Sequence, residues 1–185
     1  WLPDVFGDSA AVPQILRKAG VRYFLTQKIC WCQFNRFPHH TFLWQGIDGT
    51  RVFTHFPPAD TYNAVMTPTQ LVESSERFLE HDRATRSLYV YGYGDGGGGP
   101  SRTMLENARR LRDFEGIPPV QQETALRFFE KAEEDAVDLP VWVGELYLEL
   151  HRGTYTTHGR NKRGNRKNEE ALRLAEFLDA VDFLL

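Results

Sequence analysis

Seven polar side chains each follow an apolar or aromatic run of the kind that forms strands: Asp4, Gln27, Lys28, Asp60, Tyr62, Asn63 and Asp95. If those runs are parallel strands, all seven side chains lie at one edge of a sheet, because ligands of parallel α/β folds bind at the carboxyl ends of the strands. Two carboxyl groups at one edge suit hydrolysis of a glycosidic bond. One would be the nucleophile and the other the general acid/base, about 5–5.5 Å apart in retaining enzymes.

Each carboxyl group also has a plain structural interpretation. Asp4 and Asp95 could cap following helices or brace turns, and position alone leaves that alternative open. The glycine-rich segment 94–100 resembles a phosphate-binding loop, but it lacks the Lys-Ser/Thr of a P-loop and the spacing of a dinucleotide fingerprint. We therefore expect it to allow close approach to a ligand, with one carboxylate projecting from it, rather than to bind a nucleotide.

The elements that would position these side chains alternate between strand and helix. Runs of β-branched and aromatic residues predict strands at 21–25, 51–56, 87–93 and 141–148. Caps and apolar periodicity predict helices at 9–19, 67–80, 101–114 and 123–135, and a last helix from Asn168, whereas 27–49 has the composition of a loop. Alternation at these distances indicates parallel βαβ units, in a barrel or a doubly wound sheet.

Composition narrows the class of protein. The chain has 185 residues, 41% of them hydrophobic and 25% charged, which excludes a disordered protein and predicts one domain and part of another. A net charge of −3 argues against general nucleic-acid binding, and the basic run 151–168 is more typical of a solvated connection than of a phosphate site. No stretch approaches 18 apolar residues, so no membrane span is expected.

Two further features concern the compartment and the ends of the chain. Cys30 and Cys32 flank Trp31 and give no disulfide framework, which predicts buried thiols in a reducing, cytoplasmic compartment. Apolar residues stand at both ends, Trp1 and Leu185, whereas domains end in polar linkers. The ends therefore predict a piece of a longer protein.

Six blocks of sequence resemble the α-mannosidases of glycoside hydrolase family 38, most closely the cytosolic-type branch. The blocks are 1–7 (WLPDVFG), 28–42, 46–49 (GIDG), 55–63 (HFPPADTYN), 91–100 (YGYGDGGGGP) and 144–157 (GELYLELHRGTYTT). Together they extend over nearly the whole chain, and blocks of this length are far more specific than a single glycine-rich loop.

The resemblance implies a retaining α-mannosidase that acts on mannose-containing oligosaccharides and uses Zn²⁺ or another divalent metal such as Co²⁺. Asp4 matches the family's nucleophile, which is also a zinc ligand, and Asp95 matches the acid/base. Lys28, Tyr62 and Asn63 fall where the family contacts sugar hydroxyl groups. The implied fold is a partial seven-stranded β/α-barrel-like catalytic domain of parallel strands (1–150), then a linker and the first helix of a helical middle domain (151–185). The resemblance leaves a homo-oligomer possible.

The chain also departs from the family. The other zinc ligands of the family lie outside this chain, and zinc takes four ligands, so the chain alone is not expected to bind zinc tightly. Asp8 stands where relatives carry Tyr or His, and a third carboxylate would repel Asp4 if it were close. Two rival hypotheses are a non-catalytic carbohydrate-binding or interaction fragment and a related hydrolase of mannosylglycerate-like mannosides.

Overall fold

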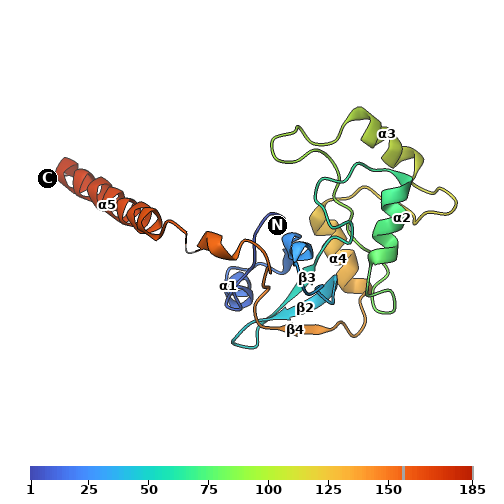
Figure 1. The fold of residues 1–185 in the computed structure, drawn as a ribbon, viewed down its shortest axis with the longest axis horizontal. Coiled ribbons are helices and arrows are strands. Elements are labelled where there is room, and N and C mark those ends of the chain that lie inside the picture. Colours follow the sequence, from blue (N-terminus) through green and yellow to red (C-terminus); the bar gives the residue numbers. More distant parts are fainter. Residues whose placement is uncertain (156, 185) are drawn as a thin grey trace. The chain divides into compact units, whose positions relative to one another are not determined.

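The structure is a computed structural model that describes residues 1–155 and 157–184 (Figure 1). Thr156, in the last of the six blocks, and Leu185, the apolar end, lie outside the described residues. The chain divides into two compact units, Trp1–Leu150 and His151–Leu185. The helices of the first unit are α1 (Val12–Lys18), the 3₁₀ helix η1 (Lys28–Trp31), α2 (Pro68–Arg77), α3 (Arg102–Arg110) and α4 (Ala125–Asp135), and this unit also contains the strands. The second unit contains the 3₁₀ helix η2 (Arg152–Tyr155) and α5 (Gly159–Leu184).

Within the described residues, a four-stranded sheet has the order β1-β3-β2-β4. Its strands are β1 (Tyr23–Leu25), β2 (Thr41–Gln45), β3 (Arg51–His55) and β4 (Val141–Val143). β1 runs parallel to β3, and β4 runs parallel to β2. The α/β class expected from the sequence is confirmed.

The expectation that all strands are parallel is wrong, because β2 and β3 form an antiparallel hairpin. β2 lies inside 27–49, whose composition indicates a loop. Residues 46–50 connect the two strands, with the Gly46 amide donating to the Thr50 carbonyl at 2.9 Å and Gly49 at φ +82°. A parallel pair needs a crossover of a dozen or more residues, so a connection this short allows only the antiparallel arrangement.

Two expected strands are shorter than the sequence indicates. In the described structure, residues 87–93 form no ladder and contribute isolated bridges from Tyr91 to Ala64 and from Tyr93 to Gly99. β4 ends at Val143 because Gly144 turns the chain at φ +114°. Beyond that turn, Leu146 forms an antiparallel bridge with Asp8.

Two helices of the first unit begin at the expected caps. Thr67 accepts a hydrogen bond from the Gln70 amide at the start of α2, and Ser101 accepts one from the Met104 amide at the start of α3. α4 packs Phe128, Phe129 and Ala132 against Leu25 of β1 and Phe53 of β3. A second buried cluster contains Phe24, Ile29, Phe42, Trp44, Val52, Phe56, Leu146 and Leu148. The aromatic residues of the chain thus build much of its core.

The last helix begins earlier than the sequence indicates. α5 starts at Gly159 rather than at Asn168, so most of the basic run is helical rather than a loop. Arg166 pairs with Glu169 and Lys167 pairs with Glu170, both at 2.7 Å, and such pairs one turn apart support a helix. In the part of the chain that the structure describes, no helix is both long enough and apolar enough to cross a membrane.

Candidate active site

The ammonium group of Lys28 pairs with the carboxylate of Asp4, Nζ to Oδ1 at 3.1 Å. The Lys28 side chain is only 7% exposed, whereas that of Asp4 is 52% exposed. Lys28 opens η1 just after β1, and the Leu2 amide donates to the Leu25 carbonyl, which fixes the segment before Asp4 beside the end of the same strand. A buried ammonium group needs a counter-ion, and Asp4 supplies it.

Two aromatic rings face the same ammonium group. Lys28 Nζ lies 3.4 Å from the centre of the Trp31 ring and 5.0 Å from the centre of the Tyr62 ring. Trp31 in turn stacks on Phe6 with ring centres 6.5 Å apart. The ammonium group therefore contacts one carboxylate and two π faces, both of which favour a positive charge.

Neutral donors hold the second carboxyl group. The Tyr62 hydroxyl donates to Asp95 Oδ1 at 3.1 Å, and Asn63 Nδ2 donates to Asp95 Oδ2 at 3.2 Å. Burial, the hydrogen bond to Asp95 and the charge of Asp4 raise the pKa of Tyr62 to about 12, with smaller contributions from the charge of Asp95 and a hydrogen bond to Asp4. The phenol is therefore protonated at neutral pH and can donate to Asp95.

Backbone bridges bring these two loops together. Gly92 N donates to the Ala64 carbonyl, which directly follows Asn63 in sequence, and the Ala64 amide donates to the carbonyl of residue 90. Asp95 has φ +52° and begins a turn that the Tyr93–Gly99 bridge closes. The Gly94 amide donates to Asn63 Oδ1 at 2.9 Å, so the Asn63 side chain is hydrogen-bonded both to the backbone of Gly94 and to the carboxyl group of Asp95. The structure thus brings together Asp4, Lys28, Tyr62, Asn63 and Asp95, five of the residues singled out from the sequence.

Asp8 has a perturbed pKa, but not through the charge repulsion with Asp4 that its position suggests. Burial raises the pKa of Asp8 to about 6, and its Oδ2 atom has no hydrogen-bond partner in the described structure. Its backbone pairs with Leu146 in both directions at 2.9 Å. Burial, rather than repulsion by Asp4, is thus the cause of the perturbed pKa of Asp8.

The described residues do not form a complete metal site. Among residues 1–155 and 157–184, no three side chains of His, Cys, Asp or Glu lie close enough together to hold a metal ion. Asp4, the zinc ligand that the resemblance implies, is instead paired with Lys28. Because structural and catalytic zinc sites use at least three protein ligands, these residues alone do not fit zinc.

The cysteines also differ from expectation, since Cys30 is exposed and Cys32 is only partly buried. Both thiols are free, and they contact different segments. Cys30 Sγ accepts from Gln27 Nε2 at 2.8 Å, whereas Cys32 Sγ lies 3.4 Å from the Tyr147 carbonyl.

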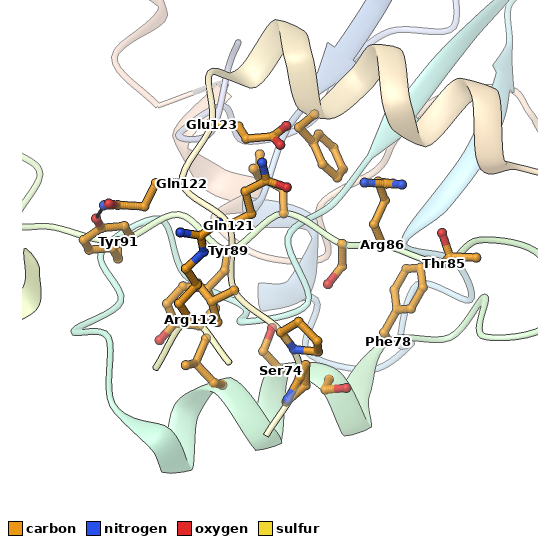
Figure 2. A pocket seen from close by; sticks show the side chains of 18 of the residues that line it. Ser74, Phe78, Thr85, Arg86, Tyr89, Tyr91, Arg112, Gln121, Gln122 and Glu123 are labelled. Atoms are coloured by element: carbon orange, nitrogen blue, oxygen red, sulfur yellow. Dashed lines mark hydrogen bonds between the residues drawn. The ribbon is translucent and has the colours of Figure 1, made fainter. Parts of the chain in front are cut away.

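A hollow of about 950 Å³ lies apart from this cluster, between α2, residues 84–91, residues 112–123 and Phe128 of α4 (Figure 2). None of the five cluster residues lines it. Three polar side chains that line it are paired with neighbouring side chains: Tyr89 with Gln70, Gln122 with Tyr91 and Arg86 with Asp135. Two carboxyl groups, Asp113 and Glu123, line the hollow, and Glu123 is paired with Lys131. Since none of the site residues expected from the sequence lines the hollow, the cluster is the better candidate for catalysis.

Comparison with known proteins agrees with the sequence resemblance. Residues 1–145 match the N-terminal domain of the family 38 glycosyl hydrolases. The chain belongs to glycosyl hydrolase family 38. It is 47% identical over 181 residues to alpha-mannosidase 2C1 of Homo sapiens and 49% identical over 178 residues to alpha-mannosidase G of Dictyostelium discoideum. These alignments include 98% and 96% of the chain, but it spans only 17% and 16% of the length of those two relatives.

A solved structure supports the fold of this family 38 chain. The crystal structure of an alpha-mannosidase from Enterococcus faecalis V583 superposes with a TM-score of 0.59, over 78% of this chain and 17% of that protein. The sequence identity is 18%, so this likeness concerns the fold alone.

Sequence reasoning missed the contact of Trp31 with Lys28, because Trp31 stands out in the sequence only as the residue between two cysteines. Lys28 and Trp31 are three residues apart, and residues at i and i+3 eclipse each other in a 3₁₀ helix. The spacing of three residues could have predicted the contact between Lys28 and Trp31, but only if residues 28–31 were known to form a 3₁₀ turn instead of an irregular loop.

Proposed function

We propose that this chain carries the two catalytic carboxyl groups of a retaining α-mannosidase of family 38. The observation that supports this most is the position of Tyr62, whose hydroxyl donates to Asp95 and whose ring faces the Lys28 ammonium group that pairs with Asp4. A single aromatic side chain thus links the surroundings of both carboxyl groups, as expected if they act on one glycosidic bond.

The partners of the carboxyl groups fit two different roles. Asp4 lies 3.1 Å from the Lys28 ammonium group, which holds the carboxyl group that would attack the anomeric carbon. Asp95 is held by the neutral Tyr62 hydroxyl and Asn63 amide, and it is exposed. Retaining hydrolysis needs this division of labour between a nucleophile and a proton donor.

In the proposed reaction, Asp4 displaces the glycosidic oxygen from the anomeric carbon of an α-mannosyl residue and forms a covalent mannosyl ester. Asp95 gives its proton to the departing oxygen. It then takes a proton from a water molecule that attacks the same carbon, which releases mannose and frees Asp4. Lys28, Tyr62 and Asn63 hold the two carboxyl groups and contact sugar hydroxyl groups.

The finer features implied by the family are part of the same proposal. Residues 1–150 would be the C-terminal part of a seven-stranded barrel-like domain, and 151–185 would lead into a helical domain. The substrates would be mannose-containing oligosaccharides, the compartment cytoplasmic, and Zn²⁺ or Co²⁺ the metal. Asp4 would be one metal ligand, but the described residues do not complete the site, so the reaction above takes no step through a metal.

Substitution of each carboxyl group tests the roles in the longest natural polypeptide that contains this chain. Asp4→Ala should abolish turnover of p-nitrophenyl-α-mannoside, because no nucleophile remains. Asp95→Ala should slow poor leaving groups most and should be rescued by azide, which needs no general base. Unchanged turnover in Asp4→Ala, or a uniform loss for all leaving groups in Asp95→Ala, would rule out the assigned role.

The lack of a complete metal site among the described residues favours a second candidate, a non-catalytic carbohydrate-binding chain. Calorimetric titration with mannobiose, combined with assays with and without added zinc, separates the two candidates. Binding without turnover under both conditions supports the second candidate. A substrate panel that includes mannosylglycerate tests the related hydrolase.

A further inference from the structure

We propose that Trp31 is a positioning residue, whose indole face holds the Lys28 ammonium group against Asp4. This inference rests on the proposed function, since the geometry it explains is that of the proposed nucleophile. It gives Trp31 a role that acts through Lys28 rather than through direct contact with the reacting atoms.

The geometry of η1 brings the two side chains together. Lys28 is the first residue of this 3₁₀ helix and Trp31 is the last, so their side chains eclipse each other. The ammonium nitrogen lies 3.4 Å from the centre of the Trp31 ring and 3.1 Å from Asp4 Oδ1. A flexible lysine side chain is thereby confined to one position.

Burial makes this contact matter. The Lys28 side chain is 7% exposed, so its ammonium group has lost most of its water. Asp4, its ion-pair partner, is 52% exposed, while Tyr62 offers a second ring at a longer distance, 5.0 Å. A cation–π contact is strongest where the cation is desolvated, and an indole is the best of the aromatic rings for it. Trp31 therefore supplies negative potential that a saturated side chain of similar size would not.

Trp31 is not a core residue whose loss would unfold the chain. The residue is 41% exposed, and it stacks on Phe6, itself 39% exposed. The fold beneath it is held separately, because Ile29 of the same helix is 1% exposed and belongs to the buried cluster that contains Phe24 and Trp44. Replacement of Trp31 should thus release Lys28 while the rest of η1 stays in place.

The first experiment is a double-mutant cycle in the longest natural polypeptide that contains this chain, with p-nitrophenyl-α-mannoside as the substrate. Trp31→Leu should lower kcat/KM about 10- to 30-fold, mainly through kcat, as expected for loss of a desolvated cation–π contact. In a Lys28→Met background, Trp31→Leu should have little further effect. Phe34→Leu removes an exposed aromatic residue of the next loop and is the matched control, with activity close to the wild type.

The second experiment changes the electrostatics of the ring without changing its shape. Mono-, di- and trifluorinated tryptophans weaken the negative face of the indole step by step, and log kcat/KM should fall linearly with fluorination. The same analogues in a Trp31→Phe background should have no effect, which controls for all other tryptophans. A fluorination series without any trend, or full additivity of Trp31→Leu and Lys28→Met with the loss confined to KM, would overturn the proposal and indicate a sugar-stacking role.

A third measurement does not depend on catalysis. Acetylation of Lys28 by an N-hydroxysuccinimide ester, followed by mass spectrometry of its peptide, should be slow in the wild type and at least several-fold faster in Trp31→Leu. If the wild type hydrolyses no mannoside, the proposed function fails, and this labelling rate alone decides the positioning role. Equal labelling in both proteins would refute that role whatever the activity.

Discussion

Gly94→Ala tests whether the position of Asn63 matters to the site, without touching any proposed catalytic group. A Cβ atom at residue 94 would lie 2.3 Å from Asn63 Oδ1, 3.3 Å from Asn63 Cγ and 3.3 Å from Tyr62 Cε2. Non-bonded heavy atoms are comfortable at about 3.5 Å, so the Asn63 amide must retreat by roughly 1 Å. That movement would break the hydrogen bonds from Gly94 to Asn63, 2.9 Å long, and from Asn63 to Asp95, 3.2 Å long.

The cost follows from those two bonds. Asp95 is exposed, so each bond contributes toward the lower end of its range, and the free energy of unfolding should fall by about 2 kcal/mol. Activity should fall further, because misplacement of a catalytic group by about 1 Å can cost roughly 100-fold in rate. Urea denaturation of the chain and kcat/KM with p-nitrophenyl-α-mannoside, in the longest natural polypeptide that contains it, measure the two effects.

Gly96→Ala is the matched control. Gly96 has φ +81°, and no atom lies within 4 Å of the position that a Cβ atom would take there, so alanine would strain the backbone by about 1 kcal/mol but push no side chain. It should lower stability with little effect on kcat/KM. If Gly94→Ala kept kcat/KM within about threefold of the wild type, or if Gly96→Ala lost as much activity, the argument that Asn63 positions Asp95 would be wrong.

Three further predictions concern stability and pH. Burial raises the pKa of Asp8 to about 6, so the stability that the protonated Asp8 provides is complete below pH 3.8 and is lost as the pH rises through 6. In urea titrations, the free energy of unfolding of Asp8→Asn should therefore gain about 1 kcal/mol on that of the wild type between pH 5 and pH 8. A difference that stays constant over this range would contradict the prediction. Glu80 is buried and accepts hydrogen bonds from the amides of His40 and Thr41 at 2.9 Å. In urea titrations, Glu80→Ala should lower the free energy of unfolding by about 3 kcal/mol, and Glu80→Gln should lower it by about half as much. Burial, followed by the charge of His40, lowers the pKa of His55 to about 3. The stability that neutral His55 provides is therefore present above pH 6.5 and is lost as the pH falls toward 3. The NMR signals of the His55 ring should not move between pH 7.5 and pH 5.

The parts of the fold that sequence can predict are those set by local signals. Thr67 is a recognisable cap and caps α2 as expected, and α3 starts near Ser101 as expected, with Ser101 as its cap. β2 escapes prediction because its five residues follow Pro38 and two histidines, and a run so short and aromatic is equally typical of a loop. The early start of α5 is hidden by Gly164, whose weak helix propensity is outweighed by ion pairs such as Arg166–Glu169.

Trp31 shows a limit of a different kind. The contact with Lys28 depends on a four-residue 3₁₀ turn, and nothing in the residues 28–31 distinguishes that turn from an irregular loop. One tertiary contact selects it, the burial of the Ile29 side chain in the core, while the hydrogen bond from the Cys30 amide to the Gln27 carbonyl, 3.1 Å long, belongs to the turn itself. Tertiary packing therefore decides which side chain faces the lysine, and local sequence does not.

The five candidate residues come together even though the expected sheet is partly wrong, and the topology explains why. Lys28 follows β1 and Tyr62 follows β3, and these two strands are a parallel pair, so their carboxyl ends do meet at one edge. The strand whose direction the sequence does not reveal is β2, and none of the five residues follows it. Asp95 needs no ladder at 87–93 at all, because the contact of Gly92 with Ala64 is enough to place its loop beside Asn63. A site predicted from strand ends thus depends only on how the strands that precede the site residues pair with each other. An error in the direction of a strand that no site residue follows does not change the prediction.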